Sequence, residues 1–220
     1  NEYLKFAKSL NDGNGKGLAV LMQESSSPTI KSIQEDFKKN LPNADWVVYE
    51  SVNNENLYDG IELAFSKRLQ PLYRLEKAQI IVSLGSDFLG VDDNNIYHTR
   101  KFAQNRNIVD ENSTMNRLYV AESSISSTGS SADHRLNVPQ YEMENLLAEL
   151  AYELKQLGLR IEAKKVKSSN NLWVKAAAKD LFDGRGESII IGGSSLSKEF
   201  HQLIALINYN LNCLLYTSDA

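Results

Sequence analysis

The chain has 220 residues, of which 42% are hydrophobic and 24% are charged, and its formal net charge is −4. This length and composition are typical of a globular protein with one good-sized core and room for a second small lobe. No basic block offsets the negative charge, which argues against nucleic-acid binding, and no run approaches the ~18 apolar residues of a membrane span.

The two ends of the sequence indicate a piece of a longer protein. The first residue is Asn1 rather than a start methionine, and no export signal precedes the first apolar run. Residues 213–220 match the in-frame read-through of a common sequencing adapter, so we expect the authentic domain to span residues 1–212. Leaving out this tail removes Cys213, the only cysteine, and with it any cysteine-ligated cluster or disulfide within the segment.

The first part of the chain reads as two strand-then-helix units. Residues 18–22 and 46–49 are continuous apolar runs, and each precedes a segment with apolar residues at spacings of three and four. The first helix is expected to begin near Pro28 and to end at 41–43, and the second covers about 57–69.

The remaining part continues the same alternation. Strands are predicted at 80–84, 118–121 and 188–191, and helices at about 96–106, 141–157, 173–182 and 196–211, with a possible loop or sub-lobe boundary near 158–172. Strands that are apolar at every residue and alternate with helices indicate a parallel sheet covered on both faces. We therefore predict an α/β fold, a three-layer α/β/α sandwich around a mostly parallel, doubly wound sheet of about five strands.

The loop after the third predicted strand is the first candidate binding loop. Gly85, Ser86 and Asp87 follow residues 80–84, where the carboxyl edge of a parallel sheet presents its ligands. The glycine would let backbone approach a phosphate, but an acid beside a pyrophosphate would be repelled. The alternative is a structural turn in which Asp87 caps a helix or hydrogen-bonds the loop.

Two further loops follow the fourth and fifth predicted strands. Glu122 and Ser123 open a serine-rich loop that includes Thr128, which offers hydroxyls and amides to an anion or forms a solvated turn. Gly192 and Gly193 precede the last helix and either hold an anion at its N-terminus or form a tight turn with positive φ, with a following serine as N-cap.

No catalytic or metal-binding set stands out. Asp133 and His134 are adjacent, so their side chains diverge on a strand or a helix and cannot form the ordered relay of a Ser-His-Asp triad. His98 and His201 have no acidic or histidine neighbour at ligand spacing. We predict no catalytic residues and no metal ligands.

Three stretches resemble the molybdopterin oxidoreductase superfamily: residues 80–90, residues 115–136 and residues 188–193 with the helix that follows. The nearest resemblance is to the cofactor-less molybdopterin-like domain in the iron–sulfur subunit of bacterial alternative complex III. Cofactor-binding members commonly carry Asp-Pro-Arg where this chain has Glu122-Ser123-Ser124, so the cationic partner of the acid is missing. The Arg, Gly and Thr expected beyond Ala132-Asp133 are also missing.

The resemblance implies a non-catalytic scaffold segment of a respiratory electron-transfer subunit, a quinol:electron acceptor oxidoreductase of the alternative complex III type. It implies no cofactor in this segment, iron–sulfur clusters in the C-terminal part beyond it, and other subunits of a membrane-bound complex as partners. It places the segment at the periplasmic face of the bacterial inner membrane. The alternative is an active domain that depends on a molybdopterin–guanine dinucleotide. The candidate residues of a vestigial cofactor cleft are Gly85, Ser86, Asp87, Glu122, Ser123, Thr128, Asp133, Gly192 and Gly193.

Overall fold

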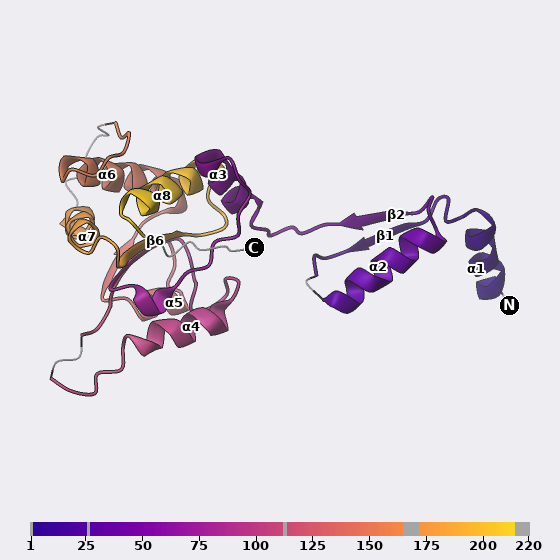
Figure 1. The fold of residues 1–220 in the computed structure, drawn as a ribbon, viewed down its shortest axis with the longest axis horizontal. Helices are drawn as coiled ribbons and strands as arrows, with labels where there is room; N and C mark the ends of the chain where they lie inside the picture. The colour runs from indigo at the N-terminus through magenta and orange to yellow at the C-terminus, as the bar shows by residue number, and fades with distance from the viewer. Residues whose placement is uncertain (1, 26, 112–113, 165–171, 214–220) are drawn as a thin grey trace. The chain divides into compact units, whose positions relative to one another are not determined.

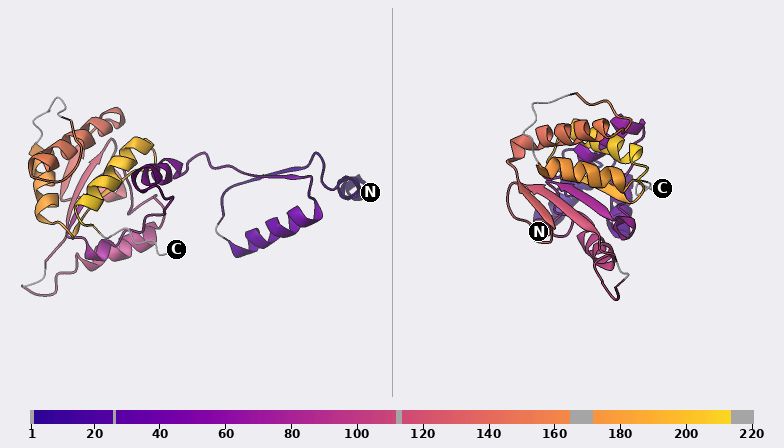
Figure 2. Two further views of the ribbon diagram at one scale, coloured as in Figure 1. Left: turned by 45° about the horizontal axis from the view of Figure 1, so that its top comes forward. Right: turned by 90° about the vertical axis from the view of Figure 1, so that its left-hand side faces the viewer.

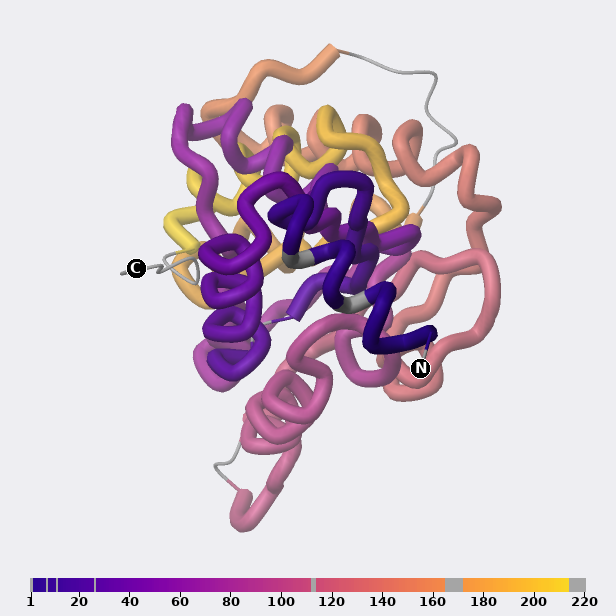
Figure 3. Tube along the Cα trace, turned by 90° about the vertical axis from the view of Figure 1, so that its right-hand side faces the viewer, coloured from indigo at the N-terminus to yellow at the C-terminus, as the bar shows by residue number. Residues whose placement is uncertain are grey.

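A computed structural model describes residues 2–25, 27–111, 114–164 and 172–213 of the chain. The chain forms two compact units, Asn1–Asn53 and Asn54–Ala220, and its path from the N- to the C-terminus can be followed in Figure 3. Of the expected adapter-derived tail, only Cys213 is described, and 214–220 lie outside the described residues. Cys213 is buried, and its N–H donates to the Asn208 carbonyl at 3.0 Å.

The N-terminal unit consists of one helix followed in the chain by a small β–α–β arrangement. Its elements are α1 (Glu2–Asp12), β1 (Ala19–Met22), α2 (Pro28–Asn40) and β2 (Asp45–Val48). The two strands pair in parallel, with Ala19 opposite Asp45 and Met22 opposite Val48. Proline at the first helical position fixes the start of α2 as predicted, and the rings of Phe37 and Trp46 pack 5.2 Å apart between helix and sheet.

The C-terminal unit contains a parallel sheet of four strands, in the order β5-β4-β3-β6. Its strands are β3 (Ile80–Leu84), β4 (Arg117–Glu122), β5 (His134–Asn137) and β6 (Ser188–Gly192). Its helices are α3 (Glu55–Phe65), α4 (Asn95–Gln104), α5 (Ser127–Ser130), α6 (Met143–Gln156), α7 (Leu172–Asp183) and α8 (Lys198–Asn210), with short 3₁₀ turns at Leu75–Lys77 and Gln140–Glu142.

Helices cover both faces of this sheet. Helices α6, α7 and α8 lie on one face, and α4 and α5 lie on the other (Figures 1 and 2). The middle of the sheet is inaccessible to solvent, because Ile81, Leu118, Val120 and Ile189 all have 0% exposure. Burial on both faces explains why the middle residues of β3, β4 and β6 are mostly apolar. The predicted α/β class is confirmed.

The strands are distributed differently from the prediction of one sheet. All five predicted strands form, but β1 and β2 pair only with each other among the described residues, and β5 is an additional strand. An apolar run predicts that a strand forms, whereas the strand with which it pairs depends on contacts between residues distant in sequence. The division between units falls at Asn53–Asn54; within the expected boundary region near 158–172, residues 165–171 lie outside the described part.

Candidate functional site

The carboxyl edge of the four-stranded sheet brings together most of the predicted site residues. The loops after β3, β4 and β6 carry Gly85 to Asp87, Glu122 to Thr128, and Gly192 with Gly193. Two backbone hydrogen bonds join these strand ends, from Gly85 N to the Ala121 carbonyl at 2.8 Å and from Gly193 N to the Leu84 carbonyl at 3.0 Å. The parallel topology therefore gathers three loops that are distant in sequence, as predicted.

Asp133 does not join this group. It precedes β5, which runs parallel to β4, so it lies at the amino edge of the sheet. Its carboxylate accepts from Leu118 N at 2.7 Å and from both terminal nitrogens of Arg106, at 3.0 and 2.5 Å. Burial raises the pKa of Asp133, but the Arg106 guanidinium and the Leu118 amide outweigh it and hold the pKa below its usual value. Its role is a structural ion pair.

The Asp87 carboxylate ties the loop after β3 to the loop after β4. Its Oδ1 accepts from both the backbone N and the hydroxyl of Thr128 at 2.8 Å. Its Oδ2 accepts from Val91 N at 3.2 Å, and the Thr128 hydroxyl in turn accepts from Leu89 N at 3.0 Å. Thr128 is fully buried. The interpretation of Asp87 as a residue that hydrogen-bonds the loop, rather than one that faces a ligand, fits this geometry.

The Glu122 carboxylate is also engaged inside the protein. It is only 5% exposed, and it accepts from Arg135 Nε at 2.5 Å and from the Ser126 hydroxyl at 2.6 Å. A side-chain carbon on Gly129 would overlap this carboxylate, so glycine is required there for space. The expectation that Glu122 lacks a cationic partner is wrong, because Arg135 supplies the charge from β5, a strand that the sequence did not reveal.

The glycine pair after β6 allows the chain to pack closely at the carboxyl edge of the sheet. Neither Gly192 nor Gly193 has positive φ, so the predicted turn geometry is wrong. A side-chain carbon on Gly193 would overlap the Gly85 carbonyl, and one on Gly192 would meet the Ile204 and Phe200 side chains. Gly85 itself has φ +68°, the left-handed region that favours glycine.

Serines at this edge make internal contacts. Ser197 caps α8 by accepting from Phe200 N at 3.3 Å, as the alternative for the last loop proposed. Ser86 is buried, and its hydroxyl donates to Asp92 at 2.6 Å, while burial raises the pKa of Asp92. Ser123 is exposed and contributes only its carbonyl, which accepts from Asn137 at 3.4 Å.

Two histidines are buried without obvious chemistry. His201, in the first turn of α8, is 1% exposed, and neither of its ring nitrogens makes a hydrogen bond of good geometry, although the Gly193 backbone lies near enough to oppose part of the effect of burial on its pKa. Burial lowers its pKa to about 4, so the ring is neutral in the folded protein. Burial also lowers the pKa of His98. Among the described residues, no three His, Cys, Asp or Glu side chains come close enough to hold a metal ion.

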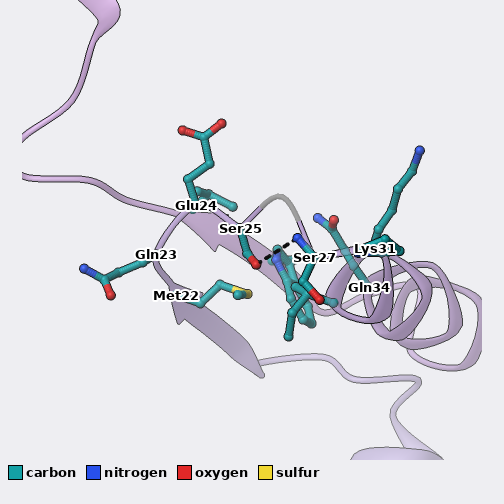
Figure 4. Close-up of a pocket in the computed structure, with 11 residues that line it drawn as sticks. Met22, Gln23, Glu24, Ser25, Ser27, Lys31 and Gln34 are labelled. Atoms are coloured by element: carbon teal, nitrogen blue, oxygen red, sulfur yellow. Dashed lines mark hydrogen bonds between the residues drawn. The ribbon is translucent and has the colours of Figure 1, made fainter. Parts of the chain in front are cut away.

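A hollow in the N-terminal unit lies outside the predicted site. It measures about 710 Å³ and is lined by residues at the end of β1, the start of α2 and β2, including Met22, Ser27, Gln34 and Trp46. Figure 4 shows Ser27 N donating to the Ser25 hydroxyl, at 3.3 Å, and the charged end of Lys31 pointing away. Among the described lining residues, Glu24 and Lys31 carry the only charges.

Comparisons with known proteins give information on the fold alone. No family profile matches the sequence, and no curated protein is similar to it. One similar solved structure is a formyltransferase/hydrolase complex from Methylorubrum extorquens in complex with methylofuran, at 11% identity and a TM-score of 0.53. The match covers 93% of this chain and 53% of that one, so the chain spans about half of that structure's length.

These comparisons correct the resemblance to molybdopterin oxidoreductases and to alternative complex III. No profile of that superfamily matches, and the structure above belongs to a formyltransferase/hydrolase complex. The stretches behind the resemblance are strand-then-loop units, which recur in many parallel sheets with unrelated functions. Among the described residues, no helix is both long and apolar enough to cross a bilayer.

Proposed function

We propose that this α/β segment is a non-catalytic scaffold in a multi-subunit complex. The observation that carries the proposal is the closure of the carboxyl edge by the protein's own side chains. Open α/β sheets bind ligands in the crevice outside this edge. In this structure the carboxylates of Asp87 and Glu122 already accept hydrogen bonds from the donors that a bound anion would need.

The occupancy of the edge has an energetic consequence. A ligand phosphate would have to displace Asp87 from Thr128 or stand beside its negative charge, and both cost free energy. Arg135, whose guanidinium reaches the end of β4, is held by the buried carboxylate of Glu122. Freeing it would leave a buried charge unpaired, which costs several kcal/mol (about 3–5) in comparable sites.

Membership in an assembly has a separate and weaker support. The structural neighbour is a multi-subunit complex by its description, although that likeness extends only to the fold. The electron-transfer role, with quinol as the electron donor, iron–sulfur clusters outside residues 1–212 and a periplasmic location, stays a prediction. So does the alternative of an active molybdopterin–guanine dinucleotide domain, which no observation on the described residues favours.

The decisive experiment measures the metal and nucleotide content of the chain purified from its own cells, and its affinity for nucleotide and phosphate. We expect no molybdenum, tungsten or guanine nucleotide above trace amounts, whether or not iron is present. Titration with GMP and inorganic phosphate should give dissociation constants weaker than about 1 mM, which corresponds to only about 4 kcal/mol of binding.

A matched pair of variants makes the titration specific to the edge. Asp87→Asn removes the charge beside Thr128 and should strengthen phosphate binding, whereas Asp36→Asn on α2 should not change it. Stoichiometric metal or nucleotide, or micromolar nucleotide binding to the unaltered chain, would contradict the scaffold function.

A further inference from the structure

The loops after β3 and β4, which meet at the Asp87 carboxylate, both expose large apolar side chains. Val91 is 84% exposed, Ile96 at the start of α4 is 85% exposed, and Ile125 is 70% exposed. Single exposed apolar residues are ordinary, but several on adjoining loops mark a contact site. We call Val91, Ile96 and Ile125, together with Asp92 and Asp93 from the same loop as Val91, the edge surface.

The edge surface is held in one conformation by hydrogen bonds beneath it. Asp87 binds the amides of Val91 and Thr128 with its two oxygens, so both loops meet on one carboxylate. Leu89 N donates to the Thr128 hydroxyl at 3.0 Å, which adds a second tie between the same loops. A surface that is already ordered loses little entropy on binding, which favours association.

The charged residues in the loops around these side chains are mainly acidic. Residues 85–99 contain three aspartates and no lysine or arginine, and residues 122–131 contain Glu122 and no basic residue. Arg135 neutralises Glu122, but no lysine or arginine pairs with Asp87, Asp92 or Asp93 in a described ion pair. Arg100 follows Ile96 by one turn on α4 and so lies beside it, but the three aspartates still leave these loops with a net negative charge.

We propose that the edge surface docks a partner polypeptide whose contact face combines apolar side chains with lysine or arginine. The charge decides between occupants. A second copy bound through the same surface would bring aspartates against aspartates, and an anionic lipid or nucleic acid would be repelled in the same way. A basic protein face is attracted and can bury Val91, Ile96 and Ile125. This inference rests on the proposed function, since it names the surface through which the scaffold holds a neighbour.

The test uses photo-cross-linking from the chain in its own cells. A benzoyl-phenylalanine at position 91 or 125 should cross-link one other polypeptide, at a peptide that carries lysine or arginine. The same probe at position 172 is the control, because Leu172 is 80% exposed on α7, away from these loops. Cross-links to a second copy, to the same chain, to lipid or to nothing would overturn the inference.

Substitution separates this inference from the proposed function. Ile125→Asp and Asp93→Lys should each lower recovery of the cross-linked partner about tenfold, as expected for a central contact, whereas Leu172→Asp should not. Native gel mass of the unaltered chain is read in parallel. A chain that migrates alone contradicts the scaffold function itself, whereas a chain that migrates in a complex without partner cross-links from positions 91 and 125 contradicts only the edge surface.

Discussion

The two units are built from the same sequence pattern but bury it to very different extents. In both, apolar strands alternate with helices and pair in parallel. In the C-terminal unit β3 has four of its five residues buried, whereas β1 and β2 contain no buried residue and α2 buries none. An apolar run therefore predicts a strand, but neighbouring elements decide whether the strand becomes core.

The difference has a physical cause in strand number. Both strands of a two-stranded sheet are edge strands, and a single helix can cover only one face of that sheet. Leu21 therefore remains 69% exposed and Tyr49 63% exposed. Such a pair is marginal in water, while three or more strands with a covered face are independently stable. We expect stability to be concentrated in the C-terminal unit.

Hydrogen exchange should show the largest difference between the units. Amides of β3, β4 and β6 should exchange only through global unfolding, because both faces of their sheet are covered. Amides of β1 and β2 should exchange at least about a thousandfold faster, the equivalent of about 4 kcal/mol in opening free energy. Exchange mass spectrometry on the whole chain measures both sets in one sample.

The helices provide an internal control for that measurement. Amides of α8, which is capped by Ser197 and buries Phe200 and Ile204, should behave like β3, whereas those of α2 should behave like β1. Equal protection of the two sheets would show that the N-terminal strands are covered by something outside the described contacts, and the comparison would then fail.

Gly193→Ala should strongly destabilise the C-terminal unit. The added carbon would overlap the Gly85 carbonyl, and backbone cannot move aside without breaking the joined ends of β3 and β6. We expect a loss of at least about 3 kcal/mol, at the upper end for overpacking. Urea unfolding monitored by circular dichroism gives the value.

Gly186→Ala is the matched control for that substitution. Gly186 has φ +89° but open space around it, so alanine costs only the strain of a left-handed residue, about 1–2 kcal/mol. A Gly193→Ala variant no less stable than Gly186→Ala would show that the loops at the carboxyl edge are not tightly packed.

The sequence predicted much of the fold because its signals there are local. Residues 80–84 were predicted as a strand with the observed bounds, and Pro28 marked the start of α2. The four residues of β5, His134 to Asn137, are mostly polar and exposed, so no apolar pattern announced an edge strand. Helix α1 was also missed.

The candidate site was predictable only in part for a similar reason. Parallel topology alone implied that the loops at Gly85, Glu122 and Gly192 would meet. The bond from Thr128 to Asp87 spans 41 positions and that from Arg135 to Glu122 spans 13, so both depend on the relative placement of loops and strands. Sequence reasoning thus located the edge but could not show that its own side chains fill it.

Arg135→Ala tests whether the closed edge is a buried electrostatic unit. Removing the guanidinium leaves the Glu122 carboxylate buried with Ser126 as its remaining side-chain partner. We expect a loss of about 2–3 kcal/mol, somewhat less than for a fully buried pair because Arg135 is partly exposed. Denaturant unfolding at pH 7 measures it.

Arg68→Ala is the control, because Arg68 also pairs with carboxylates, on α3, but in water. Its partners Glu55 and Asp59 are themselves largely exposed, so solvent screens the pairs and stability should hardly change. Similar effects of the two substitutions would mean that Glu122 is solvated in solution and that the edge is open to ligands.

His201 should make the stability of the C-terminal unit depend on pH. Burial holds its folded pKa at about 4, whereas the unfolded chain binds the proton near pH 6.5. The stability is therefore fully present above about pH 6.5 and is lost as the pH falls toward 4. Between pH 7.5 and pH 5 the group should contribute a loss of about 2 kcal/mol.

Substitution assigns that slope to His201. In His201→Leu the slope between pH 7.5 and pH 5 should flatten, with a remainder from His98, whose pKa is lowered in the same direction. Stability at pH 7.5 should not fall much, because an apolar side chain replaces a ring with two unpaired nitrogens. An unchanged slope in His201→Leu would place the imidazole in contact with water, and the packing of α8 against Gly60 and β6 would then be looser than the structure has it.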